Sequence, residues 1–142
     1  MTTPGFTGVH HVTIPVSDLQ ADITWFENCL AAERLPRFDH HDQDGAVFAV
    51  ILELPGSGPL VELRLDPAVA GAVAGYMPVA FGVRDRDELD RWISHLESHN
   101  IEHSAVATRR VGHSMDVKTR DGLLLRFYTD PAGGFASVEF TE

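Results

Sequence analysis

HHVTIPVSD, residues 10–18, is the stretch on which the interpretation of this chain depends. Apolar side chains stand at every second position, which is the pattern of a half-buried strand, and the stretch ends in residues that favour a helix start. PVAFGVRD, residues 78–85, has the same rhythm but no histidine, and at an offset of 67 residues Asp18 aligns with Asp85. Self-similarity at a fixed offset indicates a repeated structural unit. The chain therefore contains two halves that begin alike, and only the first carries the histidine pair.

The end of each half also repeats. LVELRLDP, residues 60–67, aligns at an offset of 64 with LLRFYTDP, residues 124–131. Between its beginning and its end, each half has a helical segment with apolar residues three and four apart, and then strands separated by turn residues. The order βαβββ is thus expected twice, which is an α+β fold. We expect the later strands at residues 32–40, 46–54 and 60–65, and at residues 104–111, 113–119 and 123–128.

These elements are expected to form one domain over residues 1–142, because a chain of this length suits a single hydrophobic core. Module one covers about residues 8–67, a connector about 66–76, module two about 77–131, and a C-terminal arm 132–142. The arm contains Phe135 and Phe140, which we expect to cover the mouth of a pocket or a partner subunit.

Composition excludes several classes of partner. Lys and Arg number 11 and Asp and Glu 21, a formal net charge of -10, which would repel the phosphates of nucleic acid. No apolar run approaches the roughly 20 residues that cross a bilayer, and the first residues lack a signal-peptide pattern. We therefore expect a cytoplasmic protein without membrane or nucleic-acid partners. Cys29 is the single cysteine, so any metal would have to be held by His, Asp and Glu.

Strand alternation predicts a second, less apolar sheet face. Residues such as His11, Thr13, Glu62, Arg126 and Tyr128 fall on the side opposite to the valines and leucines that suit helix packing. A face that is partly apolar and partly charged is typical of the lining of a ligand cavity.

The opening HHVTIPVSDL, the segment LVEL and the ending RDGLLLRFYTDP resemble the vicinal oxygen chelate superfamily. That superfamily includes glyoxalase I, bleomycin-resistance proteins, fosfomycin-resistance enzymes and extradiol dioxygenases. The resemblance covers about residues 8–131. It implies two tandem βαβββ modules that form a cup-shaped mixed sheet with helices on the outer face. It also implies, for metal-dependent members, one His or Glu ligand from the first strand and one Glu from the last strand of each module.

By this resemblance His11 and Glu62 are the ligand positions of module one, whereas module two has Pro78 and Arg126 there. One His and one Glu make a poor metal site, because zinc sites use three or four protein ligands and hard divalent ions need several donors. A permanently charged guanidinium beside the site disfavours a cation further. We therefore favour no metal or other cofactor, with His11 and Glu62 as the ligands if a divalent metal is bound.

Two hypotheses account for the two missing ligands. In the first, Arg126 replaces the metal and pairs with Glu62, either to hold a ligand or merely to set the packing. In the second, substitute ligands complete a metal site. The candidates are Asp39, His40, His41 and Asp42 in one hairpin, or His113 and Asp116 in module two. We interpret the hairpin DHHDQDG as a solvated tip because of its turn residues, whereas His113 fits a pocket and a surface position equally.

The favoured function is a metal-free protein that binds a small molecule, such as an antibiotic or an aromatic metabolite, as a homodimer. The alternative is a metal-dependent lyase, isomerase, dioxygenase or thiol transferase with His11 and Glu62 as ligands. Metal-free catalysis, with His11 or Glu62 as general base, stays open, and so does the question of whether the protein is an enzyme. The predicted ligand-binding residues are His11, Phe48, Glu62, His113, Arg126 and Tyr128.

Overall fold

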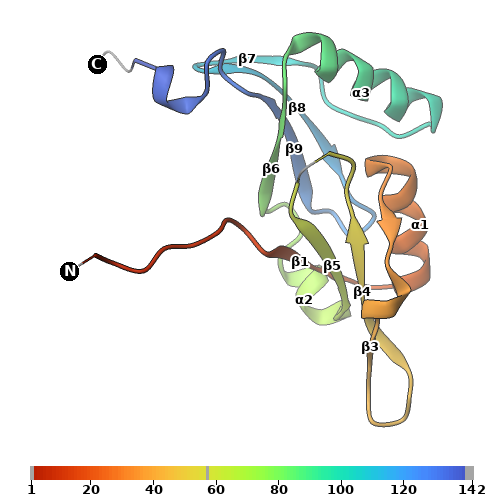
Figure 1. The fold of residues 1–142 in the computed structure, drawn as a ribbon. Coiled ribbons are helices and arrows are strands. Elements are labelled where there is room, and N and C mark those ends of the chain that lie inside the picture. The colour runs from red at the N-terminus through yellow and green to blue at the C-terminus, as the bar shows by residue number, and fades with distance from the viewer. Residues whose placement is uncertain (1, 57, 140–142) are drawn as a thin grey trace. The chain divides into compact units, whose positions relative to one another are not determined.

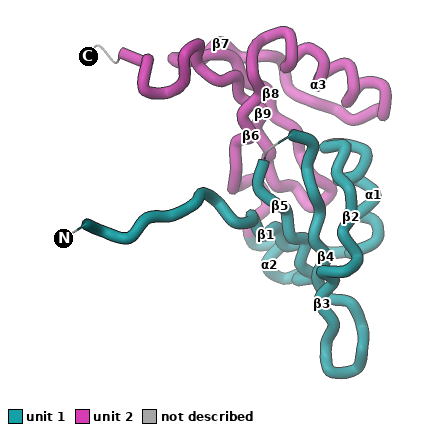
Figure 2. Tube along the Cα trace, viewed as in Figure 1, with its two compact units in different colours: residues 1–72 teal, residues 73–142 magenta. Residues whose placement is uncertain are grey.

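A computed structural model describes residues 2–56 and 58–139 of the chain. It divides into two compact units, residues 1–72 and 73–142, which Figure 2 draws in teal and magenta. The boundary between the units falls inside the predicted connector, residues 66–76. Each unit has its own sheet and its own helix packed against that sheet (Figure 1).

The first unit contains a five-stranded sheet in the order β1-β5-β4-β2, with β3 paired to β4 beside this path. Strands β1 and β5 run parallel, and β4 is antiparallel to β5. Helix α1 packs against β5, and α2 packs against β1. The elements are β1 (His11–Val16), α1 (Leu19–Leu30), β2 (Glu33–Arg34), a 3₁₀ turn (Pro36–Phe38), β3 (His40–His41), β4 (Val47–Glu53), β5 (Leu60–Leu65) and α2 (Pro67–Ala72).

Local sequence explains where helix α1 begins and ends. The Asp18 carboxylate accepts a hydrogen bond from the N–H of Ala21 at 3.0 Å, which caps the first turn. The apolar side of α1 then buries Ile23 and Phe26 against the sheet. The helix ends at Ala31, whose φ of 52° lies in the left-handed region that glycine usually occupies.

Two details of the first unit differ from the sequence-based expectation. The strand predicted over 32–40 is broken into β2 and β3, because Pro36 has no N–H to donate to a sheet and starts a 3₁₀ turn instead. The predicted connector contains helix α2, whose first turn is capped by the Asp66 carboxylate accepting from the N–H of Val69 at 3.1 Å. Proline at the first helical position after an aspartate is a favoured start.

The second unit contains a four-stranded sheet in the order β6-β9-β8-β7, with β6 parallel to β9. Helix α3 packs on β6 and β9, where the Trp92 ring lies 5.3 Å from the Phe127 ring. The elements are β6 (Val79–Val83), α3 (Arg86–Ser98), β7 (Ala107–Arg109), β8 (Gly112–Lys118), β9 (Leu124–Thr129) and a 3₁₀ turn (Phe135–Ser137).

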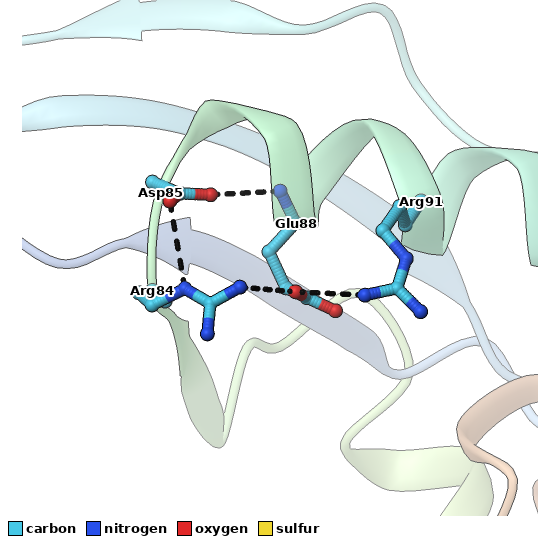
Figure 3. Close-up of polar contacts among 4 residues, drawn as sticks. All are labelled: Arg84, Asp85, Glu88 and Arg91. Carbon is cyan, nitrogen blue, oxygen red and sulfur yellow. Dashed lines mark hydrogen bonds and ion pairs between the residues drawn. The ribbon is translucent and has the colours of Figure 1, made fainter.

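Charged side chains form a network of hydrogen bonds and ion pairs at the start of α3 (Figure 3). The Asp85 carboxylate accepts from the N–H of Glu88 at 2.9 Å, so Asp85 is the N-cap. The Glu88 carboxylate in turn accepts from Arg84 at 3.0 Å and from Arg91 at 3.3 Å. These pairs are largely solvent-exposed, so each contributes little to stability.

In both units, one backbone hydrogen bond joins the end of the last strand to the end of the first strand. The residue after the last strand donates its backbone N–H to the carbonyl at the end of the first strand, from Asp66 to Val16 at 2.9 Å and from Asp130 to Val83 at 2.7 Å. The expected α+β class is confirmed, and the βαβββ order is confirmed in module two and, with β2 and β3 in place of one predicted strand, in module one. The single cup stays a prediction. In the arm, residues 132–139 carry one 3₁₀ turn with Phe135 exposed, and Phe140 lies outside the described residues.

Candidate functional site

Glu62 is the centre of a polar cluster in the first unit. It lies on β5, opposite Thr13 of β1 and Ile51 of β4, and only 4% of its surface is exposed. A carboxylate this buried needs compensating partners. Arg64, two residues along the same strand, donates from Nε to the Glu62 Oε2 atom at 2.9 Å. Residues two apart on a strand share a face, so this ion pair follows directly from the local sequence.

Two imidazoles face the other carboxylate oxygen of Glu62. The Nε2 atom of His11 lies 4.0 Å from Glu62 Oε1, and the Nε2 atom of His40 lies 3.9 Å from the same oxygen. The Nδ1 atom of His11 lies 2.9 Å from the Nδ1 atom of His10, which orients the His11 ring with Nε2 toward Glu62. Both rings are partly accessible, with 38% and 40% of their side chains exposed. They can therefore reach a molecule outside the sheet.

A β-bulge brings Phe48 to this cluster. His40 is opposite Ala49, but His41 is opposite Val47, so Phe48 is the extra residue on β4. A bulge of this kind re-aims a side chain that simple alternation would place on the other face. The Phe48 ring lies 5.9 Å from the His40 ring, and the Arg64 guanidinium carbon lies 5.2 Å from the Phe48 ring centre. The cluster thus has an aromatic surface next to its charged groups.

The predicted solvated hairpin divides into two parts. Its tip is exposed, with the Asp42 carboxylate accepting from the N–H groups of Asp44 and Ala46 at 2.8 and 3.0 Å. Asp39 is held by Arg34 in an ion pair of 2.6 Å. His40 alone among the hairpin candidates comes near Glu62.

In the second unit, Arg126 is bound by Asp116. The two residues are directly opposite one another on β9 and β8. Arg126 donates from Nε to Asp116 Oδ1 at 2.8 Å and from Nη2 to Oδ2 at 3.2 Å. The hydrogen bond to Asp116 raises the pKa of Arg126 above its already high ordinary value, so the guanidinium is permanently charged. Tyr128 lies two residues further along β9, on the same face as Arg126.

His113 does not join Arg126 and Tyr128. Register pairs Ser114 with Tyr128, so the adjacent His113 points to the opposite face of the sheet. Its Nδ1 atom is buried and lacks a hydrogen-bond partner among the described residues. Glu62 and Arg126 each have an oppositely charged partner within their own unit, and the predicted ion pair between them stays a prediction.

Among its described residues, the first unit has donor groups suited to a divalent metal, but not in an arrangement that would hold one. His11, His40 and Glu62 supply the nitrogen and oxygen donors that zinc, iron and manganese accept. Within residues 2–56 and 58–139, however, no three His, Cys, Asp or Glu side chains are arranged so that they could hold an ion. The positive charge of Arg64 also lies next to the Glu62 carboxylate, where it would repel a metal ion. In this arrangement the residues do not fit a metal ion.

Two features elsewhere lie apart from the candidate site. Burial raises the pKa of the Cys29 thiol to about 12, so this cysteine is a structural residue and not a nucleophile. An open pocket of about 490 Å³ at the C-terminal end of α3 contains none of the predicted ligand-binding residues, and its lining is Glu97, Asn100, Ile101, Glu102 and His103.

The sequence-based interpretation did not predict three contacts of the site residues, since it did not name Arg64 as a partner of Glu62 and named His40 and Asp116 only as possible metal ligands. Arg64 was readable, because it shares a strand face with Glu62. The bond between Asp116 and Arg126 depends on the register of β8 against β9, and the position of His40 depends on its pairing with Ala49 of β4. The bulge that re-aims Phe48 has no local signal in this sequence, and the register of β8 against β9 depends on the exact turn between them.

Comparisons with known proteins agree with this fold. The family model described as Glyoxalase/Bleomycin resistance protein/Dioxygenase superfamily matches residues 8–133. A lactoylglutathione lyase from Agrobacterium tumefaciens has a similar structure, with a TM-score of 0.69, 15% identity, 93% of this chain and 100% of that chain covered. No curated protein matches the chain. No helix in the described ranges is long and apolar enough to cross a membrane.

Two further solved structures are similar. TnmS3, an antibiotic binding protein from Streptomyces sp. CB03234, has a TM-score of 0.69 and 15% identity, with 89% of this chain and 98% of that chain covered. A variant of the fosfomycin resistance protein FosX from Listeria monocytogenes, in complex with Mn(II) and a dihydroxypropylphosphonic acid, has a TM-score of 0.64 and 17% identity. That match covers 87% of this chain and 93% of the FosX chain.

Proposed function

Since this chain belongs to the Glyoxalase/Bleomycin resistance protein/Dioxygenase superfamily, we propose that it binds a small molecule and does so without a metal ion. The observation that carries this proposal is the bond from Arg64 to Glu62. Glu62 is the carboxylate that corresponds to a family metal ligand, and a guanidinium already neutralises it. TnmS3, an antibiotic binding protein with a similar structure, is a precedent for binding on this fold.

Charge in the second unit supports the same proposal. The position equivalent to Glu62 is Arg126, a permanent cation held by Asp116. The Arg64 guanidinium therefore lies beside Glu62 in the first unit, and the Arg126 guanidinium occupies the equivalent position in the second. A metal-dependent protein would need free carboxylates at these two positions. Arginine can bind an anionic or carbonyl group of a ligand directly, through paired N–H donors. Positive charge at these positions makes a divalent ion unnecessary.

The first unit has groups of its own that can contact a ligand. Phe48 presents an aromatic ring, and His11 and His40 present partly exposed imidazoles beside it. An aromatic surface with a few convergent polar groups is typical of small-molecule sites. We further propose that the protein is cytoplasmic and that it acts as a homodimer. Size-exclusion chromatography with light scattering would test the homodimer.

A metal-dependent enzyme is the second candidate function, and one observation favours it. The Nε2 atom of His40 lies 3.9 Å from Glu62 Oε1, and the Nε2 atom of His11 lies 4.0 Å from it, so two imidazole nitrogens lie near one carboxylate oxygen. A small movement of the side chains, with Arg64 turned away, would give the donor set of two histidines and one carboxylate. A bound metal would polarise oxygen atoms of a substrate. His11, His40 and Glu62 would hold the ion.

Two measurements separate these functions. Metal analysis of the purified full-length protein is expected to show less than one ion per chain, and a thermal-shift screen of aromatic metabolites and antibiotics should find stabilising compounds that remain effective with a chelator present. His11→Ala and His40→Ala should weaken such compounds, and His99→Ala, an exposed residue beyond α3, is the matched control. One tightly held ion per chain that is lost in His40→Ala would instead establish the metal-dependent function.

A further inference from the structure

We infer that the second unit has a carboxylate-binding subsite in which Arg126 contacts the ligand and Asp116 is a positioning residue. This inference rests on the proposed function and names the chemical group of the ligand. The evidence is the two-bond contact between the side chains, 2.8 Å from Nε to Oδ1 and 3.2 Å from Nη2 to Oδ2.

The donors of the guanidinium divide into two edges. Arginine has five N–H donors in a fixed plane, and one edge is formed by Nε–H with one N–H of the neighbouring amino group. Asp116 occupies that edge of Arg126. Within residues 2–56 and 58–139, Asp116 is the hydrogen-bonding partner of Arg126, and it leaves open the end of the guanidinium, where the two amino groups each direct one N–H forward. Such an end matches the two oxygens of a carboxylate. Asp116 therefore fixes the plane in which a ligand carboxylate must lie.

The neighbouring strand leaves room on this face. On β6, Ala80 is opposite Arg126 and Gly82 is opposite Tyr128. Both small residues are exposed, so no long side chain from β6 covers the guanidinium. Asp130 approaches Gly82, since its Oδ1 atom lies 2.7 Å from the position that a Cβ at Gly82 would take. The open part of the face is therefore over Ala80, next to Arg126.

The nearby charges determine what kind of selectivity this subsite has. Asp116 and Asp130 outweigh the single positive charge of Arg126, so simple attraction of anions is weak here. A planar carboxylate can still form two charge-assisted hydrogen bonds with the oriented guanidinium end, whereas a spherical anion cannot match both donors. We therefore expect selectivity for shape, with planar oxyanions preferred over halides. The Tyr128 hydroxyl lies on the same face and adds a neutral donor.

The test is an NMR titration of the ¹⁵N-labelled full chain with benzoate, benzamide and iodide, with the arginine Nε–H signals as readout. Benzoate should shift the Arg126 signal and bind about tenfold more tightly than benzamide, the effect of one charge-assisted hydrogen bond. Arg126→Lys, followed through its backbone amide signals, should retain iodide binding and lose the preference for benzoate.

Asp116→Asn separates positioning from plain electrostatics. Removal of a negative charge alone would raise the affinity for benzoate and iodide by the same factor. A positioning role predicts that the ratio of the two affinities falls by about tenfold while iodide binds at least as well. The control is Asp90→Asn, which removes a carboxylate that is paired at 2.9 Å with Arg86 on the exposed side of α3. It should leave the ratio unchanged.

The outcomes distinguish this inference from the proposed function. If neutral aromatics bind and benzoate binds no more tightly than they do, the carboxylate subsite is wrong and the metal-free binding function stands. The same conclusion follows if Asp116→Asn changes the affinities for benzoate and iodide by the same factor. If benzoate shifts signals only away from Arg126, the subsite is also wrong. If none of the screened compounds stabilises the protein and a metal ion is tightly held, the proposed function itself fails.

Discussion

Arg64→Met should convert the first unit from a poor metal site into a measurable one. The substitution retains most of the length of the side chain, removes its charge and frees the Glu62 Oε2 atom, which accepts from Arg64 at 2.9 Å. His11, His40 and Glu62 would then face one another without a competing cation. We expect the dissociation constant for Zn²⁺ to fall in this variant.

The size of the effect follows from the geometry. Two unit charges that share a carboxylate, about 4 Å apart, repel by about 1 kcal/mol in water and about 4 kcal/mol at an effective dielectric constant near 20. The Arg64 side chain is 44% exposed, so the lower value applies. Doubling for a divalent ion gives about 2 kcal/mol, or about 30-fold in the dissociation constant.

Competition with a chromophoric chelator would measure this change in the full-length protein. Arg86→Met is the matched control, because Arg86 is similarly exposed at 48% and also pairs with a carboxylate at 2.9 Å, but on α3. Adding His40→Ala to Arg64→Met should remove the gain. An affinity for Zn²⁺ that changes by less than about threefold in Arg64→Met would refute the claim that this guanidinium excludes a metal.

Three other substitutions test the structure more widely. Ala31→Gly should stabilise the protein by about 1 kcal/mol in urea unfolding, because the left-handed φ of 52° strains a residue with a Cβ; a loss of stability would contradict the helix end described above. Gly112→Ala should destabilise by about 1–3 kcal/mol, since its Cβ would collide with Thr129 Oγ1 and lie 3.0 Å from the Thr129 carbonyl; an unchanged Tm would be inconsistent with this close approach. The hydrogen bond to the Ser104 carbonyl raises the pKa of His103 above its ordinary 6.5, so its contribution to stability is full below pH 6.5 and is lost as pH rises through the raised pKa. Urea unfolding on both sides of this range should show that His103→Gln weakens the pH dependence, and identical profiles would exclude the histidine as its source.

Alternation and spacing predicted the strands because a strand repeats every two residues, and this pattern survives in any register. The sequence could also place His11 and Glu62 on one face, since that depends on the same period. The wrong predictions concerned two short segments of the chain. Pro36 interrupts a strand that alternation alone would continue, and the helix start at Asp66 and Pro67 was readable but was interpreted as a connector.

The missed parts of the site depend on pairing between strands. Asp116 reaches Arg126 because β8 and β9 pair in one particular register, which depends on the exact geometry of the turn between the two strands. His40 reaches Glu62 because β3 pairs with β4 so that His40 is opposite Ala49, and Phe48 reaches His40 and Arg64 because one extra residue on β4 changes the direction of its side chain. Contacts of this kind depend on residues far apart in sequence, whereas composition and period are properties of a single segment.

The backbone bonds from Asp66 to Val16 and from Asp130 to Val83 involve no side-chain atoms. Each half is consequently held together by backbone atoms that every amino acid except proline can supply, and its interior positions are free to exchange acid for base. A duplicated scaffold of this sort can preserve its architecture while its two copies diverge in chemistry, as the carboxylate in one and the guanidinium in the other illustrate.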